Sequence, residues 1–364
     1  MATFERFEIG ADITRAATLP ARAYSDPAVY EAQRERVFAR SWQLAGTLDD
    51  VKVPGQTRPL TLLEGCLDEP LLLTRDREDR VHCLSNVCTH RGTILCEHGG
   101  VEKSLVCRYH GRRFDLDGTC RHMPEFTKVI GFPGAKDNLP RVRFGTWGKF
   151  VLASLDPLSP LDEVIEPMRE RLAWFPLGDL RFDPRRSRDY LVNANWALYC
   201  DNYLEGFHIP FVHASLNETI DYGGYTTELY RWSSLQLGVS RNREGCFDPP
   251  ASSPDHGRNV AAYYWWLFPN TMINVYPWGI SVNIVKPLGV SRTRVSFLSY
   301  VLDESRIGEG AGADLDRVER EDEAVVEAVQ RGCRSRLYDR GRYSPDREQG
   351  VHHFHRLLCA AMFE

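Results

Sequence analysis

The sequence predicts an α+β protein of two domains, a small β domain followed by a larger domain that combines helices with an antiparallel sheet. The length favours two domains, because 364 residues are more than a single domain of about 150 residues would use. Residues 50–155 have the texture of strands and turns, whereas the chain beyond them mixes helical and strand patterns. Segment 156–160, with two prolines and a serine, is the expected linker.

The composition is that of an ordinary globular protein, with 43% hydrophobic and 26% charged residues. The net charge of −5 does not provide the excess of positive charge that is typical of nucleic-acid-binding proteins. The chain has no apolar run of about 18 residues, the length of a membrane span, and its N-terminal segment lacks the apolar centre of a secretion signal. We therefore expect a cytoplasmic protein without nucleic-acid or membrane partners, whose cysteines other than Cys88 and Cys107 are reduced thiols.

The first predicted helix starts at Asp26, which can cap it, with Pro27 as its first residue. Four apolar residues then share one helical face: Tyr30, Val37, Phe38 and Trp42. Gly46 is expected to end the helix. This pattern predicts an N-terminal helical segment, residues 1–45, that packs on the larger domain.

The β domain is expected to span residues 46–155. Leu71–Thr74 and Val81–Leu84 have strand character and flank a polar turn, which predicts a hairpin. Asp117-Gly118 marks a second tight turn. Loops at the ends of these strands would project side chains from a small β scaffold.

Two Cys-then-His pairs lie on such loops: Cys88-Thr-His90 and, 16 residues later, Cys107-Arg-Tyr-His110. Two thiolates can hold one iron of a [2Fe–2S] cluster and two imidazoles the other, and neutral imidazoles raise the reduction potential of such a cluster. A Cys₂His₂ set also suits structural zinc, but zinc ligands usually come as a CxxC pair and an HxxxH pair. The pairing here therefore favours an iron–sulfur electron carrier.

The larger domain, residues 156–364, is predicted to combine a sheet with helices. Three segments have helical periodicity: 161–175, 195–208 and 314–332. Residues 223–302 are mostly strand, and their clearest apolar alternation is Val295, Phe297, Ser299 and Val301. Such alternation is typical of an antiparallel sheet with one buried face.

The predicted helix 195–208 carries Glu205 and His208 on its polar face, opposite a face rich in aromatic residues. Pro210 must end or kink this helix, and the break lets His213 turn back toward His208. Two imidazoles beside a carboxylate at a helix end are the beginning of a non-haem iron site. For each residue taken alone, a solvated helix face is the simpler interpretation.

Asp322 is the predicted third ligand. In the helix over 314–332 it falls among apolar residues of one face: Leu315, Val318, Val325 and Val329. The neighbouring acids fall off that face: Glu319, Glu321 and Glu323. A lone carboxylate on a buried face is costly unless it is paired or bound to a metal. Pairing with a buried arginine is the alternative, but two His and one carboxylate form a facial triad that leaves positions open for O₂.

These motifs resemble those of the large, or alpha, subunit of Rieske non-haem iron oxygenases, over nearly the whole chain. The two Cys-then-His pairs and the turn after them resemble the Rieske signature CxHRG…CxYHG…FDxxG. Glu205-x₂-His208-x₄-His213 resembles the family's D/E-x₂-H-x₄-H, and the surroundings of Asp322 resemble its ED…QRG element. The resemblance implies a Rieske β domain joined to a helix-grip catalytic domain, in which an antiparallel sheet wraps a long helix.

The resemblance also implies cofactors and partners. A [2Fe–2S] Rieske cluster would be held by Cys88, His90, Cys107 and His110. A mononuclear non-haem Fe(II) would be held by His208, His213 and Asp322. NAD(P)H would act only indirectly, through a flavin or iron–sulfur reductase or a ferredoxin. Family members form homotrimers in which the cluster of one chain faces the iron of its neighbour, so His110 of one subunit would bond Glu205 of the next, which bonds His208.

Two positions depart from the family pattern. The family usually has CPYHGW, whereas this chain has Arg108 and then Arg112 and Arg113, which predicts a cationic rim that docks an acidic face of the reductase or ferredoxin. Local salt bridges are the alternative, with Asp115, Asp117 or Glu125 as partners. Glu205 replaces the Asp that is commoner in ring-dihydroxylating members, and a bridging Glu resembles the carnitine monooxygenase branch.

The expected reaction is the hydroxylation of a small organic substrate with O₂. Residues 263–278 are densely aromatic, which fits either a cage for a quaternary ammonium group, through cation–π attraction, or an aromatic core. Their FPNxMxNxYP texture resembles choline, glycine betaine and carnitine monooxygenases, so we favour hydroxylation beside a quaternary nitrogen, with N-demethylation or C–N cleavage. Ring hydroxylation of an aromatic acid is the second candidate. A Rieske redox carrier or sensor without oxygenase activity is the alternative of another class.

Overall fold

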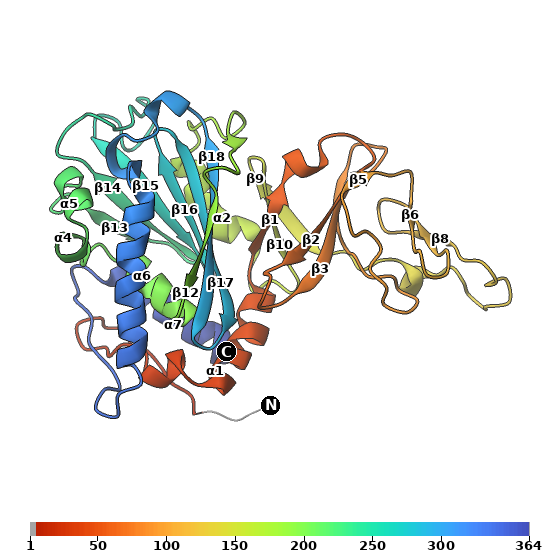
Figure 1. The fold of residues 1–364 in the computed structure, drawn as a ribbon, viewed down its shortest axis with the longest axis horizontal. Coiled ribbons are helices and arrows are strands. Elements are labelled where there is room, and N and C mark those ends of the chain that lie inside the picture. Colours follow the sequence, from red (N-terminus) through yellow and green to blue (C-terminus); the bar gives the residue numbers. More distant parts are fainter. Residues whose placement is uncertain (1–4, 364) are drawn as a thin grey trace. The chain divides into compact units, whose positions relative to one another are not determined.

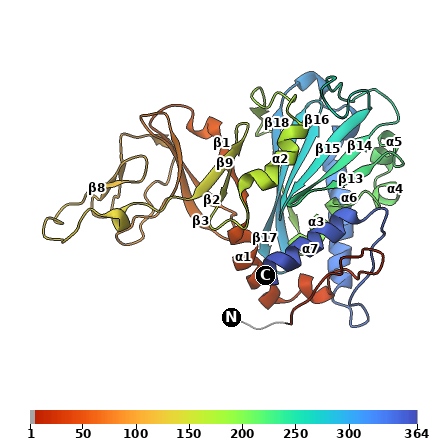
Figure 2. The same ribbon diagram turned by 180° about the vertical axis from the view of Figure 1, so that it is seen from behind.

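The computed structural model describes residues 5–363, and the chain divides into two compact units. One unit is residues 39–157, and the other joins the chain before residue 39 to the chain from residue 158 onward. The α+β class with antiparallel sheets is confirmed, as Figure 1 and Figure 2 show from two sides. The divisions fall after residues 38 and 157, and the domain limits expected after residues 45 and 155 stay a prediction.

The 39–157 unit contains three antiparallel sheets. Their strand orders are β1-β10-β9, β4-β3-β2-β5 and β6-β7-β8. The strands are β1 (Gln43–Thr47), β2 (Gln56–Leu62), β3 (Glu69–Arg75), β4 (Val81–Ser85), β5 (Gly100–Val101), β6 (Leu105–Val106), β7 (Arg113–Phe114), β8 (Cys120–His122), β9 (Arg143–Trp147) and β10 (Phe150–Ser154).

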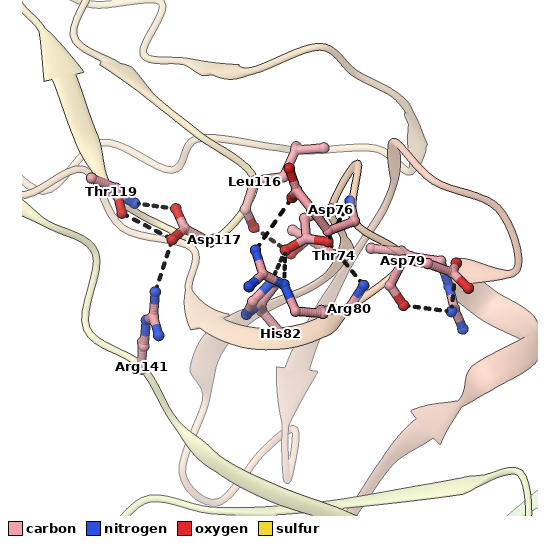
Figure 3. A network of polar contacts seen from close by, with 11 residues as sticks. Thr74, Asp76, Asp79, Arg80, His82, Leu116, Asp117, Thr119 and Arg141 are labelled. Atoms are coloured by element: carbon pink, nitrogen blue, oxygen red, sulfur yellow. Dashed lines mark hydrogen bonds and ion pairs between the residues drawn. The ribbon is translucent and has the colours of Figure 1, made fainter.

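The predicted hairpin forms between β3 and β4, and a buried carboxylate fixes its turn (Figure 3). Asp76 is 4% exposed. One of its carboxylate oxygens accepts a hydrogen bond from the backbone N–H of Arg80, and the other lies 2.7 Å from His82 Nε2. At the end of β3, the Thr74 hydroxyl donates to the Leu116 carbonyl at 2.5 Å. The hairpin is thereby tied to the turn that follows the second Cys-then-His pair.

That turn requires a glycine. Gly118 has a φ of +86°, and a Cβ added to it would lie 3.1 Å from a methyl carbon of Leu84 and 3.2 Å from the Cβ of Leu139. Both leucines belong to a core cluster that also contains Cys88 and Cys107. The loops that carry the Cys-then-His pairs therefore rest directly on the core of this unit.

The other unit is built on an eight-stranded antiparallel sheet. Its strand order is β11-β18-β17-β16-β15-β14-β13, and β12 pairs with β18. The strands are β11 (Arg181–Phe182), β12 (Arg188–Val192), β13 (Thr226–Leu229), β14 (Ser233–Val239), β15 (Val260–Leu267), β16 (Thr271–Tyr276), β17 (Gly279–Gly289) and β18 (Arg292–Val301). The prediction that residues 223–302 are mostly strand is confirmed.

Helices cover this sheet. They are α1 (Pro27–Arg36), α2 (Leu161–Arg171), α3 (Trp196–Tyr203), α4 (Ile209–Val212), α5 (Ala214–Thr219), α6 (Leu315–Gly332) and α7 (Gln349–Phe363). In Figure 1, α6 runs lengthwise across one face of the sheet, and α3 packs against both α6 and β17. The helix α7, which the sequence patterns did not reveal, packs on α1, α3 and β13. This arrangement of a sheet around a long helix agrees with the predicted catalytic domain.

Short 3₁₀ helices complete the described structure at Ala21–Tyr24, Phe38–Arg40, Leu48–Val51, Ala135–Asp137, Glu304–Arg306 and Gly310–Gly312. Among residues 5–363, none of the helices combines the length and the apolar character needed to cross a membrane.

The end of the first helix was predicted wrongly. α1 begins as expected, because the Asp26 side chain accepts a hydrogen bond from the backbone N–H of Ala28 at 2.8 Å. It ends at Arg36, however, and Gly46 lies inside β1 with a φ of +137°. Pairing of β1 with β10 decides the conformation here, because long-range strand contacts override the local helical periodicity.

Candidate metal centres and their cavity

The two Cys-then-His pairs occupy tight turns in the 39–157 unit. The Cys88 carbonyl accepts a hydrogen bond from the Gly92 N–H at 3.0 Å, and the Cys107 carbonyl accepts one from the Gly111 N–H at 2.9 Å. Both glycines have a positive φ, of 74° and 73°, which glycine adopts without strain. The sequence folds into these two turns, and each turn presents a thiol and an imidazole.

The four side chains fit a [2Fe–2S] cluster with two thiolate and two imidazole ligands. The Cys88 and Cys107 side chains are buried, and the ring centroids of His90 and His110 lie 4.9 Å apart. Burial and the adjoining Cys107 thiol raise the pKa of Cys88. Burial and the adjoining His110 lower the pKa of His90, which favours the neutral imidazole that binds metal. His110 Nδ1 is buried without a hydrogen-bond partner among residues 5–363, as expected of a nitrogen that faces a metal.

One part of the predicted docking rim is wrong. Arg108 and Arg113 are exposed, but Arg112 is 2% exposed and forms an ion pair with Asp137 at 2.7 Å. The turn after His110 directs the Arg112 side chain inward, so it cannot meet a partner protein. Its carboxylate partner also differs from the alternatives expected from the sequence, which were Asp115, Asp117 and Glu125.

His208, His213 and Asp322 come together in the larger unit. Their candidate ligand atoms all lie within 4.8 Å of one another. Asp322 Oδ1 is 3.0 Å from His213 Nε2 and 3.5 Å from His208 Nε2. Burial opposes protonation of His213, but its hydrogen bonds with Asp322 and Glu321 raise its pKa overall. Two imidazoles and one carboxylate that converge on one point have the donor set of a facial triad for non-haem iron.

The helix before the two histidines ends earlier than predicted. α3 stops at Tyr203, and the Glu205 carboxylate then accepts a hydrogen bond from the backbone N–H of His208 at 3.0 Å. Pro210 does not end a helix. It stands in the first turn of α4, where its missing N–H has no intrahelical partner to lose. His208 and His213 flank α4, and this short helix brings their ring centroids to 5.0 Å.

Asp322 lies on α6, but the buried face of that helix differs from the predicted apolar stripe. Val329, which was placed on the stripe, is 43% exposed. Glu319, which was placed off it, is 4% exposed and accepts a hydrogen bond from the Tyr199 hydroxyl at 2.6 Å. Gln330 is also buried, and it accepts from the backbone N–H of Asn195 at 2.6 Å. Polar residues can occupy this face because α3 and its start supply hydrogen-bond partners.

Carboxylates fix the orientation of both imidazole rings. Glu205 Oε1 lies 2.6 Å from His208 Nδ1, and Glu321 Oε2 lies 2.8 Å from His213 Nδ1. With Nδ1 engaged in this way, Nε2 of each ring faces Asp322 and is available to a metal. Partners of this kind orient metal-binding histidines and raise the basicity of the ligand nitrogen.

A cavity lies beside the triad, on the face of the sheet that α6 crosses. Gln236, Tyr264 and Asn274 are cross-strand neighbours on β14, β15 and β16, and all three line the cavity. Tyrosine rings form much of the wall: Tyr199, Tyr203, Tyr225, Tyr264 and Tyr276. The acidic lining residues are Glu205, Glu319 and Asp322, and no lysine or arginine among the described residues lines it. Such a lining suits a small cation with an apolar surface.

The aromatic segment 263–278 contributes to both the cavity and the core. Tyr264 and Tyr276 line the cavity, with ring centroids 6.0 Å apart. Tyr263 and Trp265, the neighbours of Tyr264 on β15, are fully buried. Because alternate side chains of a strand point to opposite faces, only part of the segment can reach the cavity.

Gln236 and Glu319 are cavity residues that sequence reasoning missed. The Gln236 Nε2 donates to the Tyr203 carbonyl at 2.6 Å, which leaves its Oε1 buried and without a partner among residues 5–363. Burial raises the pKa of Glu319 well above the usual range of a glutamate. Neither residue belongs to a motif, and only the sheet register and the α3–α6 contact bring them to the cavity.

Comparison with known proteins identifies two family models in this chain. Residues 41–133 match the Rieske [2Fe-2S] domain, and residues 177–363 match the catalytic domain of the ring hydroxylating alpha subunit. The second match covers about half of the chain. Together they agree with the resemblance inferred from the motifs.

Curated relatives and solved structures are similar over almost the whole chain. The chloroplastic choline monooxygenase of Arabidopsis thaliana is 33% identical over 95% of this chain and 83% of its own length. The carnitine monooxygenase oxygenase subunit of Escherichia coli K12 is 29% identical over 94% of this chain and 93% of its own. The structure of a quaternary ammonium Rieske monooxygenase, 23% identical, superposes with a TM-score of 0.79 over 99% of this chain and 100% of that one. This last likeness supports the fold.

Proposed function

Because this chain belongs to the ring-hydroxylating alpha subunits of the Rieske oxygenases, we propose that it hydroxylates a small quaternary ammonium compound at a carbon beside the nitrogen. One oxygen atom of O₂ enters a C–H bond, and two electrons and two protons reduce the other to water. The hydroxylated product then loses a carbon fragment, by N-demethylation or C–N cleavage. A Rieske [2Fe–2S] cluster and a mononuclear iron are the cofactors of this oxygenase.

The residues that line the cavity are the main support for the proposed substrate class. Tyrosine rings and carboxyl groups surround a space beside the triad that no lysine or arginine of the described chain enters. A trimethylammonium group is positively charged and apolar at its surface, so aromatic faces attract it by about 0.5–2 kcal/mol per ring. The relatives named choline monooxygenase and carnitine monooxygenase support the same substrate class.

Ring hydroxylation of an aromatic acid is the second candidate, and the charge of the cavity disfavours it. A substrate carboxylate is usually bound by arginine or lysine, and neither type lines the cavity among the described residues. The same absence applies to the carboxylates of glycine betaine and carnitine, so the feature that distinguishes the two candidates is the ammonium group, which only the first candidate carries. The tyrosine rings alone do not distinguish the two candidates, because they would also pack against an aromatic substrate.

The residues around the triad have separable roles in this proposal. When bound, the iron activates O₂ with electrons that the cluster provides. His208, His213 and Asp322 would hold the iron, and two imidazoles with one carboxylate are a donor set that leaves positions open for O₂. Glu205 keeps the His208 ring in place through the 2.6 Å contact at Nδ1. Tyr264 orients the ammonium group so that one methyl or methylene group faces the triad.

We also propose that electrons reach the iron from the cluster of a neighbouring copy in a homotrimer, with His110 of one subunit bonded to Glu205 of the next. A solved relative is described as using inter-subunit electron transfer. Tyr109, whose ring lies 3.7 Å from that of His110, is 56% exposed, and Phe211 on α4, near Glu205 in sequence, is 80% exposed. Exposed aromatic side chains beside both ends of this route support an interface.

The electron donor in this proposal is a separate flavin or iron–sulfur reductase or a ferredoxin that oxidises NAD(P)H. Arg108 and Arg113 remain candidates for its docking site, because both are exposed near the cluster ligands. Arg112 is no longer part of that site. The cytoplasmic location expected from the sequence stays a prediction.

A substrate panel tests the proposed activity. Protein loaded with cluster and iron would be combined with NADH and a generic reductase, and O₂ consumption would be measured with choline, glycine betaine, carnitine and benzoate. We expect O₂ consumption coupled to the formation of formaldehyde or another aldehyde with one or more of the ammonium compounds. Coupled formation of a phenol or diol from benzoate, without turnover of any ammonium compound, would favour the second candidate.

The number of irons bound per chain distinguishes an oxygenase from a redox carrier. An oxygenase binds the two irons of the cluster and one more at the triad, whereas a carrier binds the cluster alone. Substitution of His213 by alanine is the matched control, because it should remove the single iron and leave the cluster.

A further inference from the structure

Arg112 is a buried cation packed against the loops that hold the cluster ligands. Its side chain is 2% exposed, and its guanidinium pairs with Asp137 at 2.7 Å. The guanidinium carbon also lies 5.9 Å and 5.1 Å from the ring centroids of Phe126 and Phe132. Burying a charged pair costs desolvation energy that mutual attraction often fails to offset. A role in stability alone is therefore a weak explanation for this arginine.

We propose that Arg112 is a positioning residue for the [2Fe–2S] cluster and that its buried charge raises the reduction potential of the cluster. This inference depends on the cofactor and is independent of the substrate proposed above.

Arg112 connects the turns of both ligand pairs. Its Nη1 donates to the Thr89 hydroxyl at 2.9 Å, and Thr89 stands between Cys88 and His90. Its backbone carbonyl accepts a hydrogen bond from the Cys107 N–H at 2.8 Å. The Phe126 ring under the guanidinium also contacts the edge of His90, with centroids 5.6 Å apart. A change at Arg112 therefore acts on the ligands of both irons.

Arg112 brings a positive charge close to the ligand loops, because its Nη1 lies 2.9 Å from the hydroxyl of Thr89, the residue between Cys88 and His90. Reduction gives the cluster one more negative charge. A cation fixed nearby, in a medium less polar than water, stabilises that reduced state, and the net charge around such clusters sets their potential.

One donor of the Arg112 side chain is unsatisfied, since its Nε is buried and has no hydrogen-bond partner among residues 5–363. A buried N–H without a partner is uncommon in folded proteins, and hydrogen bonds to cluster sulfur raise the reduction potential. The family pattern CPYHGW usually has tryptophan at this position, which supplies bulk without a net charge. The arginine of this chain therefore changes the electrostatics of the site.

Redox titration of the holoenzyme, followed by circular dichroism and electron paramagnetic resonance, tests the inference in the absence of substrate. Arg112→Gln should lower the midpoint potential, with at least a tenfold loss in electron affinity, which corresponds to about 59 mV for a one-electron couple. Asp137→Asn removes the neutralising carboxylate and should raise the potential. Arg113→Gln is the matched control, because that exposed charge is screened by water and salt.

The opposite signs of the two buried substitutions distinguish charge from loosened packing. If Arg112→Gln and Asp137→Asn both lowered the potential, or if Arg112→Gln behaved as Arg113→Gln does, the inference would be overturned. If Arg112→Gln failed to assemble a cluster, Arg112→Lys and Asp137→Asn would decide. Arg112→Lys keeps the positive charge, so its midpoint potential should stay above that expected for an uncharged residue at this position. Its electron paramagnetic resonance spectrum should change, since the ammonium group cannot bond Thr89 in the same way.

Discussion

Replacing Tyr264 by leucine tests how the cavity binds its ligand. Tyr264 is at the centre of the ring set, with its centroid 6.4 Å from that of Tyr225 and 6.0 Å from that of Tyr276. In a site shielded from water, one ring contributes about 1–2 kcal/mol to the binding of a cation. Leucine keeps an apolar contact but has no negative ring face. The dissociation constant for choline should therefore increase about 5- to 30-fold.

Isothermal titration of the iron-loaded protein without O₂ measures this change, and 3,3-dimethylbutan-1-ol is the matched probe. It has the shape of choline with a carbon in place of the nitrogen, and so it has no charge. Tyr264→Leu should change its affinity by less than about 3-fold, and Tyr264→Phe, which keeps the ring, should bind choline nearly as the unmodified protein does. If Tyr264→Leu weakened both ligands equally, the loss would reflect shape alone and the cation–π argument would fail.

Three further outcomes are expected. Glu205→Gln should reduce coupled turnover by about 100-fold, because it disturbs the His208 contact, while the visible spectrum of the cluster stays unchanged; near-normal turnover would contradict the electron route. His213→Ala should lower the iron content by one per chain and abolish turnover with the cluster intact, and an unchanged iron content would place the metal elsewhere. Asp76 is largely buried, which by itself would raise its pKa, but hydrogen bonds from His82 and Arg80 lower the pKa from 3.8 to about 2. Its contribution of about 2 kcal/mol to stability is thus present above about pH 4 and lost as the pH falls through 2. Asp76→Asn should lose it at pH 7 in urea unfolding, and the difference between the two proteins should shrink toward pH 2.

Motif spacing identified the two Cys-then-His pairs and the Glu205–His213 motif, whereas Asp322 was predicted from the apolar residues around it and from the family resemblance. The short separations within each Cys-then-His pair and within the Glu205–His213 motif are local, so a turn or a short helix fixes them. Asp322 is far away in sequence, yet the structure brings it to His213 at 3.0 Å. The role of these residues as metal ligands stays a prediction that iron counting tests.

Features that depend on tertiary contacts were not accessible from the sequence. The direction of Arg112 is set by the turn after His110 and by Asp137, which is 25 residues further along the chain. The early end of α3 results from the Glu205 carboxylate, which takes a backbone N–H that a longer helix would have used. Glutamate is usually a surface residue, and only the hydrogen bond from the Tyr199 hydroxyl on α3 explains why Glu319 is buried. For Arg112 and Glu319 a partner distant in sequence decides between exposure and burial, whereas the end of α3 depends on a local contact that the helical periodicity did not reveal.

The central claim is that electrons pass from the cluster to the iron site, where a quaternary ammonium substrate is hydroxylated. A single-turnover experiment tests this claim most directly. The cluster would be reduced chemically and the protein separated from the reductant. It would then be mixed with O₂ in the presence of choline, glycine betaine, carnitine or benzoate, while the absorbance of the cluster and the product are recorded. The account predicts rapid reoxidation of the cluster together with aldehyde formation when a suitable ammonium compound is bound. Reoxidation and hydroxylated product with benzoate, and with none of the ammonium compounds, would contradict it.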